Sequence, residues 1–333
     1  MKAPMLKKGM TIGIFSPSTG ISAIVPERYD RGVSFLESKG FKIKHGKLYR
    51  KNDCYRSGSI KERADEFNDL LHDEEVDILM SAIGGNNTNS ILPYIDYDYL
   101  MKHPKIIIGY SDVTALLLGI YSRTGITTFY GPAAAASFGE FPPYVEETYS
   151  SFMDILTMNK GTQYTYQMPA YWTDEMIDWK KQDRAKDRRP NEWITVNGGI
   201  AEGRLIGGNL NTMEGFFGTP YMPEIKKGDI LMIEDTQKTA STIERSFSLL
   251  KLSGVLDKVS GIILGKHELF KDQGTGRKPY EIFMEVFGDR DIPILAEFDS
   301  CHCHPMLTLP IGVRVRLDAT EKKLTLLESP VTD

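Results

Sequence analysis

The stretch KIIIGYSDVTALLLG, Lys105–Gly119, joins a short β-branched run to an apolar run of helical composition. Runs such as Ile106–Ile108 are typical of strands buried on both faces of a parallel sheet, and Val113–Leu118 continues as the start of a helix. Ser111 is therefore predicted at the turn between a strand and a helix. Two interpretations are open here: the serine caps the helix, or it is a nucleophile beside the N–H donors of the helix N-terminus. The G-x-S-x-G signature of nucleophile turns is incomplete, because only its first glycine, Gly109, is present.

Around this stretch, strand-like and helix-like segments alternate, which predicts a parallel sheet covered by helices. Strands are expected at residues 11–15, 41–44, 77–82, 105–108 and 127–130. Helices are expected from Pro26 to Ser38 and, after the capping box Ser59–Glu62, to about Leu71. The strands end in polar or glycine-rich turns. In an open sheet, the turns at the carboxyl ends of the strands line one crevice, where ligands bind.

The composition changes at about Thr148–Asn197, which is rich in charge, tryptophan and tyrosine and indicates a connecting segment or mobile loop. Later strands are expected at 203–206, 229–234, 261–264, 292–295 and 313–317, with helices at 243–252 and 280–287. The predicted fold class is α/β, in three parts. Residues 1–150 form an N-terminal parallel-sheet α/β domain, residues 151–198 a connecting segment and substrate loop, and residues 199–333 a smaller C-terminal mixed β/α domain.

The bulk composition excludes several classes of function. A length of 333 residues with 41% hydrophobic residues favours two domains, and a net charge of −5 argues against a nucleic-acid partner. Three cysteines, two of them a single residue apart, indicate a reducing compartment. No signal peptide and no apolar stretch long enough to span a bilayer is recognisable. We therefore expect a cytoplasmic protein without a membrane partner.

A serine nucleophile needs a base, and the base needs an orienting partner. His45, His72 and His103 lie in polar stretches, which indicates solvated surface residues. The loop FDSCHCHPMLTLPIG, which follows a predicted strand, holds His302 and His304 and is the best candidate for the base. At this point either histidine is possible.

The CHCH run, Cys301–His304, also suggests a metal site. In an extended chain the two cysteines face one side and the two histidines the other, so the four side chains cannot surround one ion tetrahedrally. Only Cys54 remains elsewhere. We therefore expect no metal.

Two further elements have catalytic character. Glu234 ends the apolar strand of LMIEDT and is a candidate orienting carboxylate, whereas Asp235 is better explained as a helix cap. The glycine pair in Gly84–Asn87 lacks the spacing of phosphate-binding loops. It suits an oxyanion hole, in which the backbone N–H groups of Gly85 and Asp112 are the expected donors.

Six motifs in order resemble the LD-carboxypeptidase family of serine peptidases, most of all its microcin C self-immunity branch. They are GGNN, IIIGYSDVTALL, GRLIGGNLNT, LMIEDT, TIERSFSLLKLSGVLDKVSGIILGKHE and HPMLTLPIG. The resemblance covers nearly the whole chain. It implies an N-terminal α/β domain joined to a C-terminal mixed domain, an active site between them, a homodimer and no cofactor.

The resemblance also implies the catalytic residues. The family's serine falls on Ser111, its glutamate on Glu234 and its histidine on His302, which is selected by counting back from the turn Leu309–Gly312. This chain departs from the family pattern with Cys301 where glycine is usual and with a histidine two residues after His302.

Two activities compete within the family. Murein carboxypeptidases release a terminal D-alanine, and the immunity branch cuts the bond between an aminoacyl group and an adenylate-type nucleotide. Trp179 resembles the branch's stacking tryptophan and favours the second activity, because an indole stacks on adenine and finds no such surface on D-alanine. The alternative is that the tryptophans only anchor the loop. Further substrate-binding positions implied by the resemblance are Asn209, Lys238 and Glu268. A rival from another class is a non-catalytic nucleotide or peptide binder.

Overall fold

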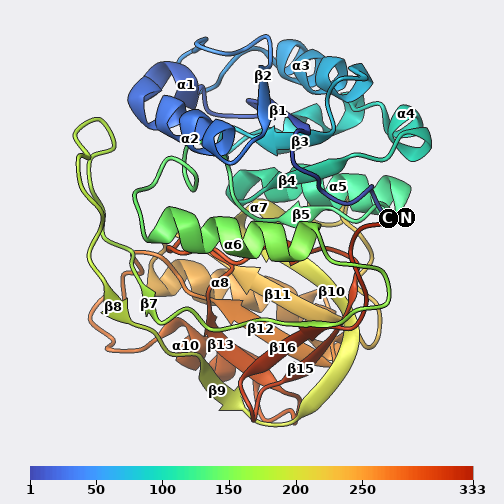
Figure 1. The fold of residues 1–333 in the computed structure, drawn as a ribbon. Helices are drawn as coiled ribbons and strands as arrows, with labels where there is room; N and C mark the ends of the chain where they lie inside the picture. The colour runs from blue at the N-terminus through green and yellow to red at the C-terminus, as the bar shows by residue number, and fades with distance from the viewer. Residues whose placement is uncertain (333) are drawn as a thin grey trace.

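A computed structural model describes residues 1–332 of the chain and contains two large β-sheets (Figure 1). The first sheet has the strand order β14-β5-β4-β3-β1-β2, in which all neighbours are parallel except β14 and β5. Its strands are β1 (Thr11–Phe15), β2 (Lys42–His45), β3 (Ile78–Ser81), β4 (Ile106–Gly109), β5 (Phe129–Tyr130) and β14 (Leu309–Pro310). The order 2-1-3-4-5 creates a crevice between the carboxyl ends of β1 and β3, where the connections leave in opposite directions.

The second sheet has the order β6-β16-β15-β10-β11-β12-β13-β9. Its central strands β10 to β13 are parallel, and the outer ones are antiparallel. Its strands are β6 (Tyr164–Thr165), β9 (Ile194–Asn197), β10 (Ile200–Asn209), β11 (Ile230–Glu234), β12 (Gly261–Gly265), β13 (Ile294–Phe298), β15 (Arg314–Asp318) and β16 (Lys323–Leu326). The predicted α/β fold class is confirmed.

Helices cover both sheets, and α6 lies across the region between them in Figure 1. The α-helices are α1 (Ile21–Ile24), α2 (Pro26–Ser38), α3 (Ile60–His72), α4 (Tyr97–Lys102), α5 (Thr114–Thr124), α6 (Tyr144–Leu156), α7 (Leu210–Glu214), α8 (Ala240–Leu252), α9 (Val255–Lys258) and α10 (Pro279–Phe287). Two 3₁₀ turns are η1 (Thr88–Tyr94) and η2 (Ser111–Val113). Within residues 1–332 no helix combines the length and the apolar character that crossing a membrane requires.

Local sequence signals explain several of these boundaries. Helix α2 begins at a proline, which suits the first helical position, and spans the predicted residues. Helix α3 begins after Ser59, whose side chain accepts from the Glu62 backbone N–H while the Glu62 carboxylate accepts from the Ser59 N–H. Strand β10 runs three residues further at each end than predicted. Its end carries Gly207 and Gly208, both at positive φ, which strand propensity disfavours.

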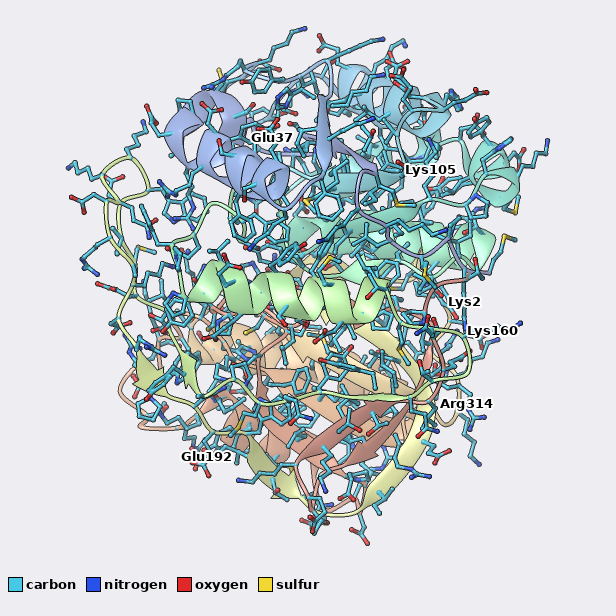
Figure 2. The ribbon with its side chains drawn as sticks, viewed as in Figure 1. Lys2, Glu37, Lys105, Lys160, Glu192 and Arg314 are labelled. Carbon is cyan, nitrogen blue, oxygen red and sulfur yellow. The ribbon has the colours of Figure 1, made fainter. Side chains whose placement is uncertain are left out.

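Segments distant in sequence complete each sheet. Residues 151–198 supply the edge strands β6 and β9 and a separate pair of β7 (Tyr171–Trp172) with β8 (Arg189–Pro190). Strand β14, from the C-terminal half, joins the first sheet. The two ends of the chain meet, because the Met5 N–H donates to the Thr332 carbonyl (Figure 1). Side chains fill the region between the two halves, with Lys105 on the first half and Arg314 on the second (Figure 2).

Candidate active site

Ser111 lies two residues after the end of β4, at the start of η2, and three residues before α5. Its φ of +61° is a conformation that residues other than glycine rarely adopt. Neither η2 nor α5 has a side-chain cap, so the helix-cap interpretation of Ser111 is wrong. Close packing demands glycine just before this turn, since a Cβ on Gly109 would lie 2.8 Å from Cγ1 of Val113.

Ser111, His302 and Glu234 form one hydrogen-bonded chain. The Nε2 atom of His302 lies 2.9 Å from Oγ of Ser111, and its Nδ1 atom lies 2.7 Å from Oε2 of Glu234. The serine follows a strand of the first sheet, the glutamate ends β11 of the second, and the histidine is in the loop after β13. The Glu234 side chain is fully buried, and 11% of the His302 side chain is exposed. This is the geometry of a nucleophile, a base and an orienting carboxylate.

Glu234 and His302 each shift the pKa of the other toward the charged form. Burial by itself raises the pKa of Glu234, but the charge and hydrogen bond of His302, with hydrogen bonds from Tyr130 and Asn209, bring it below its ordinary value. Burial by itself lowers the pKa of His302, but the charge and hydrogen bond of Glu234 raise it above its ordinary value. An ionised glutamate thus stabilises the imidazolium that forms when the histidine accepts a proton.

Two side chains hold the other oxygen of Glu234. Oε1 accepts from the Tyr130 hydroxyl at 2.6 Å and from Nδ2 of Asn209 at 2.9 Å. The Tyr130 oxygen also accepts from the backbone N–H of Ser111 at 3.3 Å. Tyr130 therefore connects the serine turn to the carboxylate. It ends β5, at the carboxyl edge that the sequence predicted to face the crevice, but composition alone did not single it out.

Asn209 is 4% exposed, and its side chain points to protein groups instead of to the cavity described below. Its Oδ1 accepts from the backbone N–H and the hydroxyl of Thr212, while its Nδ2 donates to Glu234 and, at 3.4 Å, to Asp235. Asn209 is therefore not among the residues that line the cavity, and its substrate-binding role stays a prediction. Its contacts orient the carboxylate.

The Gly84–Asn87 loop is fastened to the serine turn by Asp112. Its Oδ2 atom accepts from the backbone N–H groups of Asn87 and Thr88, at 2.8 and 2.9 Å, and from the Thr88 hydroxyl. A Cβ on Gly84 would lie 2.9 Å from Cβ of Ser111, so only glycine permits this approach. Since the N–H of Ser111 already donates to Tyr130, donors for an oxyanion have to come from neighbouring residues.

A cavity of about 570 Å³ opens at Ser111 and His302. The residues lining it are Thr19, Ile83, Gly84, Gly85, Tyr110, Ser111, Ala136, Glu175, Met176, Ile177, Asp178, Trp179, Lys186, Thr236, Gln237, Glu268, His302 and His304. Two of the predicted substrate residues, Trp179 and Glu268, are among them. Lys238 is not, and its Nζ lies 3.7 Å from Oδ1 of Asp235. Burial and the Glu234 charge raise the pKa of Asp235 to about 6.

The loop between β7 and β8 brings Trp179 to the cavity and extends up beside α2 (Figure 1). The guanidinium of Arg28, on α2, lies 4.2 Å from the centre of the Trp179 ring and donates to the side chain of Gln182. The base of the loop is attached close to His302, because Thr173 and His304 exchange two backbone hydrogen bonds of 2.9 and 3.0 Å. Sequence analysis missed Arg28, since nothing in helix α2 marks it.

His304 makes no contact with Ser111. Its Nε2 lies 3.8 Å from Oε2 of Glu140. Burial, with the charges of Lys186 and Arg28, brings the pKa of His304 well below its ordinary value, so the ring is neutral. Cys301 and Cys303 are buried free thiols. In the described part of the chain, residues 1–332, no three His, Cys, Asp or Glu side chains are grouped to hold a metal ion.

Comparison with known proteins identifies the family. Residues 12–131 match the LD-carboxypeptidase N-terminal domain, and residues 202–317 match the LD-carboxypeptidase C-terminal domain. The chain belongs to the LD-carboxypeptidase family. The predicted resemblance is confirmed, and with it the predicted class of enzyme, a serine peptidase.

Relatives within the LD-carboxypeptidase family include both a self-immunity protein and a probable murein peptide carboxypeptidase. The microcin C7 self-immunity protein MccF of Escherichia coli is 53% identical over 98% of this chain and 95% of that protein. A solved structure of MccF in complex with aspartyl sulfamoyl adenosine matches with a TM-score of 0.98 and 52% identity, and covers all of both chains. A probable murein peptide carboxypeptidase of Bacillus subtilis is 30% identical over 96% of this chain and 92% of that protein.

Proposed function

We propose that this protein is a serine hydrolase that cleaves the acyl bond between an aminoacyl or peptidyl group and an adenylate-type nucleotide. Such a reaction detoxifies a microcin C-like antibiotic and provides self-immunity. The observation that carries the proposal is that one cavity is lined both by Ser111 and by the indole of Trp179. The MccF relative, whose structure contains aspartyl sulfamoyl adenosine, supports the same substrate class.

In the proposed reaction, His302 accepts the Oγ proton of Ser111 as the serine attacks the acyl carbon. The distances of 2.9 and 2.7 Å in the Ser111–His302–Glu234 chain support these roles. The N–H groups of Gly85 and Asp112 donate to the tetrahedral oxyanion, which contributes about 3 kcal/mol per donor. His302 then returns the proton to the leaving nucleotide, and water hydrolyses the acyl-enzyme.

In the bound state we propose that adenine stacks on Trp179 and that Glu268, on the same cavity wall, accepts from the α-ammonium of the aminoacyl group. A half-buried indole in the cavity supports the first assignment. A carboxylate lining the cavity, fixed by a hydrogen bond from the Thr236 hydroxyl, supports the second. Lys238 acts through Asp235, beside which its ammonium lies.

The deciding experiment compares hydrolysis of an aminoacyl-sulfamoyl adenosine with hydrolysis of a murein tetrapeptide. We expect cleavage of the adenylate analogue and little or none of the tetrapeptide. The Ser111→Ala variant should bind the analogue without cleaving it. Hydrolysis that survives in this variant contradicts the assignment of Ser111 as the nucleophile. If the wild-type protein binds the analogue without cleaving it, the protein is instead a non-catalytic nucleotide or peptide binder.

The second candidate function is release of terminal D-alanine from murein tetrapeptides, which the relative from Bacillus subtilis favours. D-alanine has no flat surface for an indole, so this activity would be indifferent to Trp179. Efficient release of D-alanine by both the wild type and Trp179→Ala would show that the protein is a murein carboxypeptidase.

We further propose that the protein acts as a homodimer in the cytoplasm. The family resemblance supports the dimer, and the free thiols Cys54, Cys301 and Cys303 support a reducing compartment. Light scattering of the purified protein and fractionation of cells test the two statements separately.

A further inference from the structure

Lys186 is a nearly buried ammonium on the wall of the active-site cavity. Only 5% of its side chain is exposed, yet Nζ forms no hydrogen bond with any group in residues 1–332. Its one charged neighbour within 4 Å is Oε2 of Glu140, at 3.7 Å, which is beyond hydrogen-bond length. Because only solvent in the cavity can otherwise satisfy its three donors, this ammonium is available to an acceptor on a ligand.

Glu140 does not neutralise this lysine, because other groups already occupy the carboxylate. Arg28 donates to Oε2 at 3.0 Å, while the side chain of Gln182 and the backbone N–H of Phe141 donate to Oε1. Two buried cations thus share one anion, which leaves one of the two positive charges without a carboxylate of its own. Burial lowers the pKa of Lys186, although the charge of Glu140 acts in the opposite direction.

His304, on the same wall of the cavity, also has a polar atom without a partner within residues 1–332. It is 5% exposed, lines the cavity and has a buried Nδ1 without a hydrogen-bond partner in the described residues. It lies two residues from His302 in the sequence, and both histidines line the same cavity as Ser111.

We propose that Lys186, assisted by His304, forms a subsite for an anionic oxygen of the ligand. The inference rests on the proposed function, whose substrates carry such oxygens in two places. One is the phosphoryl group that links the aminoacyl group to the nucleoside, and the other is an acidic side chain on the aminoacyl group. Either anion would satisfy the unused donors and the excess positive charge.

Two matched pairs of ligands distinguish the two sources. AMP and adenosine differ in the phosphoryl group, and aspartyl and asparaginyl sulfamoyl adenosine differ in one carboxylate. Binding is measured calorimetrically, for the second pair in the Ser111→Ala background to prevent cleavage. We expect the wild-type protein to prefer the anionic member of at least one pair by about 10- to 100-fold.

Lys186→Met should abolish that preference and leave unchanged the binding of the pair member that lacks the distinguishing phosphoryl group or carboxylate. Lys186→Arg should retain part of the preference, and it also tests the subsite if the methionine variant does not fold. Lys180→Met is the matched control, because Lys180 is an exposed lysine of the same loop, and it should bind as the wild type does.

Loss of preference in the AMP pair identifies the phosphoryl group as the anion, and loss in the aspartyl pair identifies the carboxylate. Unchanged preferences in both pairs, or equal weakening of all four ligands, overturn the subsite. Failure of the wild-type protein to bind any of the four is a different result, because it contradicts the proposed nucleotide substrate itself.

Discussion

The hydroxyl of Tyr130 donates a 2.6 Å hydrogen bond to Oε1 of Glu234, although 104 positions separate the two residues in the sequence. Tyr130 ends a strand of the first sheet and Glu234 a strand of the second. Because the Tyr130 hydroxyl oxygen also accepts from the Ser111 N–H, one buried hydroxyl connects the serine turn to the Glu234 carboxylate.

Replacing Tyr130 with phenylalanine should therefore reduce kcat with little change in KM. The variant leaves the Ser111 N–H without its partner and removes one donor from Glu234, at a cost of about 1–3 kcal/mol. A reduction of kcat of about 10- to 100-fold on the adenylate analogue follows. Tyr144→Phe is a control at another buried tyrosine, whose hydroxyl donates to the Asp187 carbonyl away from the catalytic chain. Equal effects of both variants would mean that Tyr130 acts only through folding.

The pH profile of the reaction should show the effect of Glu234 on His302. The base accepts a proton only when neutral, so kcat/KM rises as pH passes upward through the His302 pKa. Because Glu234 raises that pKa, the rise should occur above the ordinary histidine value of 6.5. In Glu234→Gln the raising charge is absent, so the rise should move to lower pH while kcat falls on the order of 10⁴-fold. A profile that does not move would show that another group titrates.

Asp112 should affect the oxyanion donors through the Gly84–Asn87 loop. Asp112→Ala removes an acceptor of three hydrogen bonds and frees the loop, so kcat should fall by about 10- to 1000-fold if Gly85 donates to the oxyanion. Asp112→Asn keeps an acceptor oxygen and should retain more activity. A loss confined to KM in the alanine variant would assign the loop to substrate binding instead.

Trp179 should contribute to the binding of substrates that contain a nucleotide and not to the binding of murein peptides. Trp179→Ala should weaken binding of the adenylate analogue by about 1–3 kcal/mol, and Trp179→Phe should retain part of that binding. Met176→Ala, at an exposed residue of the same cavity wall, is a control for loop packing. An equal loss of activity on a murein tetrapeptide would show that Trp179 supports the loop and does not recognise the base.

Local patterns determined much of this protein. The β-branched runs and apolar periodicity predicted the central strands of both sheets and the helices α2, α3, α8 and α10, because burial in a sheet or against it restricts composition at each position. They missed helix α6 and the short strands β6, β9, β14 and β16. Strand ends marked Ser111, Gly85 and Glu234 as crevice residues, since parallel strands bring their carboxyl ends to one edge. The residues left His302 and His304 open and the family resemblance selected His302, which is the one of the two whose ring lies within hydrogen-bond distance of Ser111.

The roles of several residues around the cavity became visible only in the tertiary structure, because they depend on contacts between distant segments. Tyr130, Arg28 and Lys186 have no local signature, because their importance comes from partners supplied by other elements. For Asn209 the family resemblance implied a contact with the ligand, whereas in the packed structure its amide donates to Glu234. Residues and their periodicity thus specified the elements and the reactive groups. Which donors remain unsatisfied in the cavity was fixed only when the two sheets, and the loop between β7 and β8, packed together.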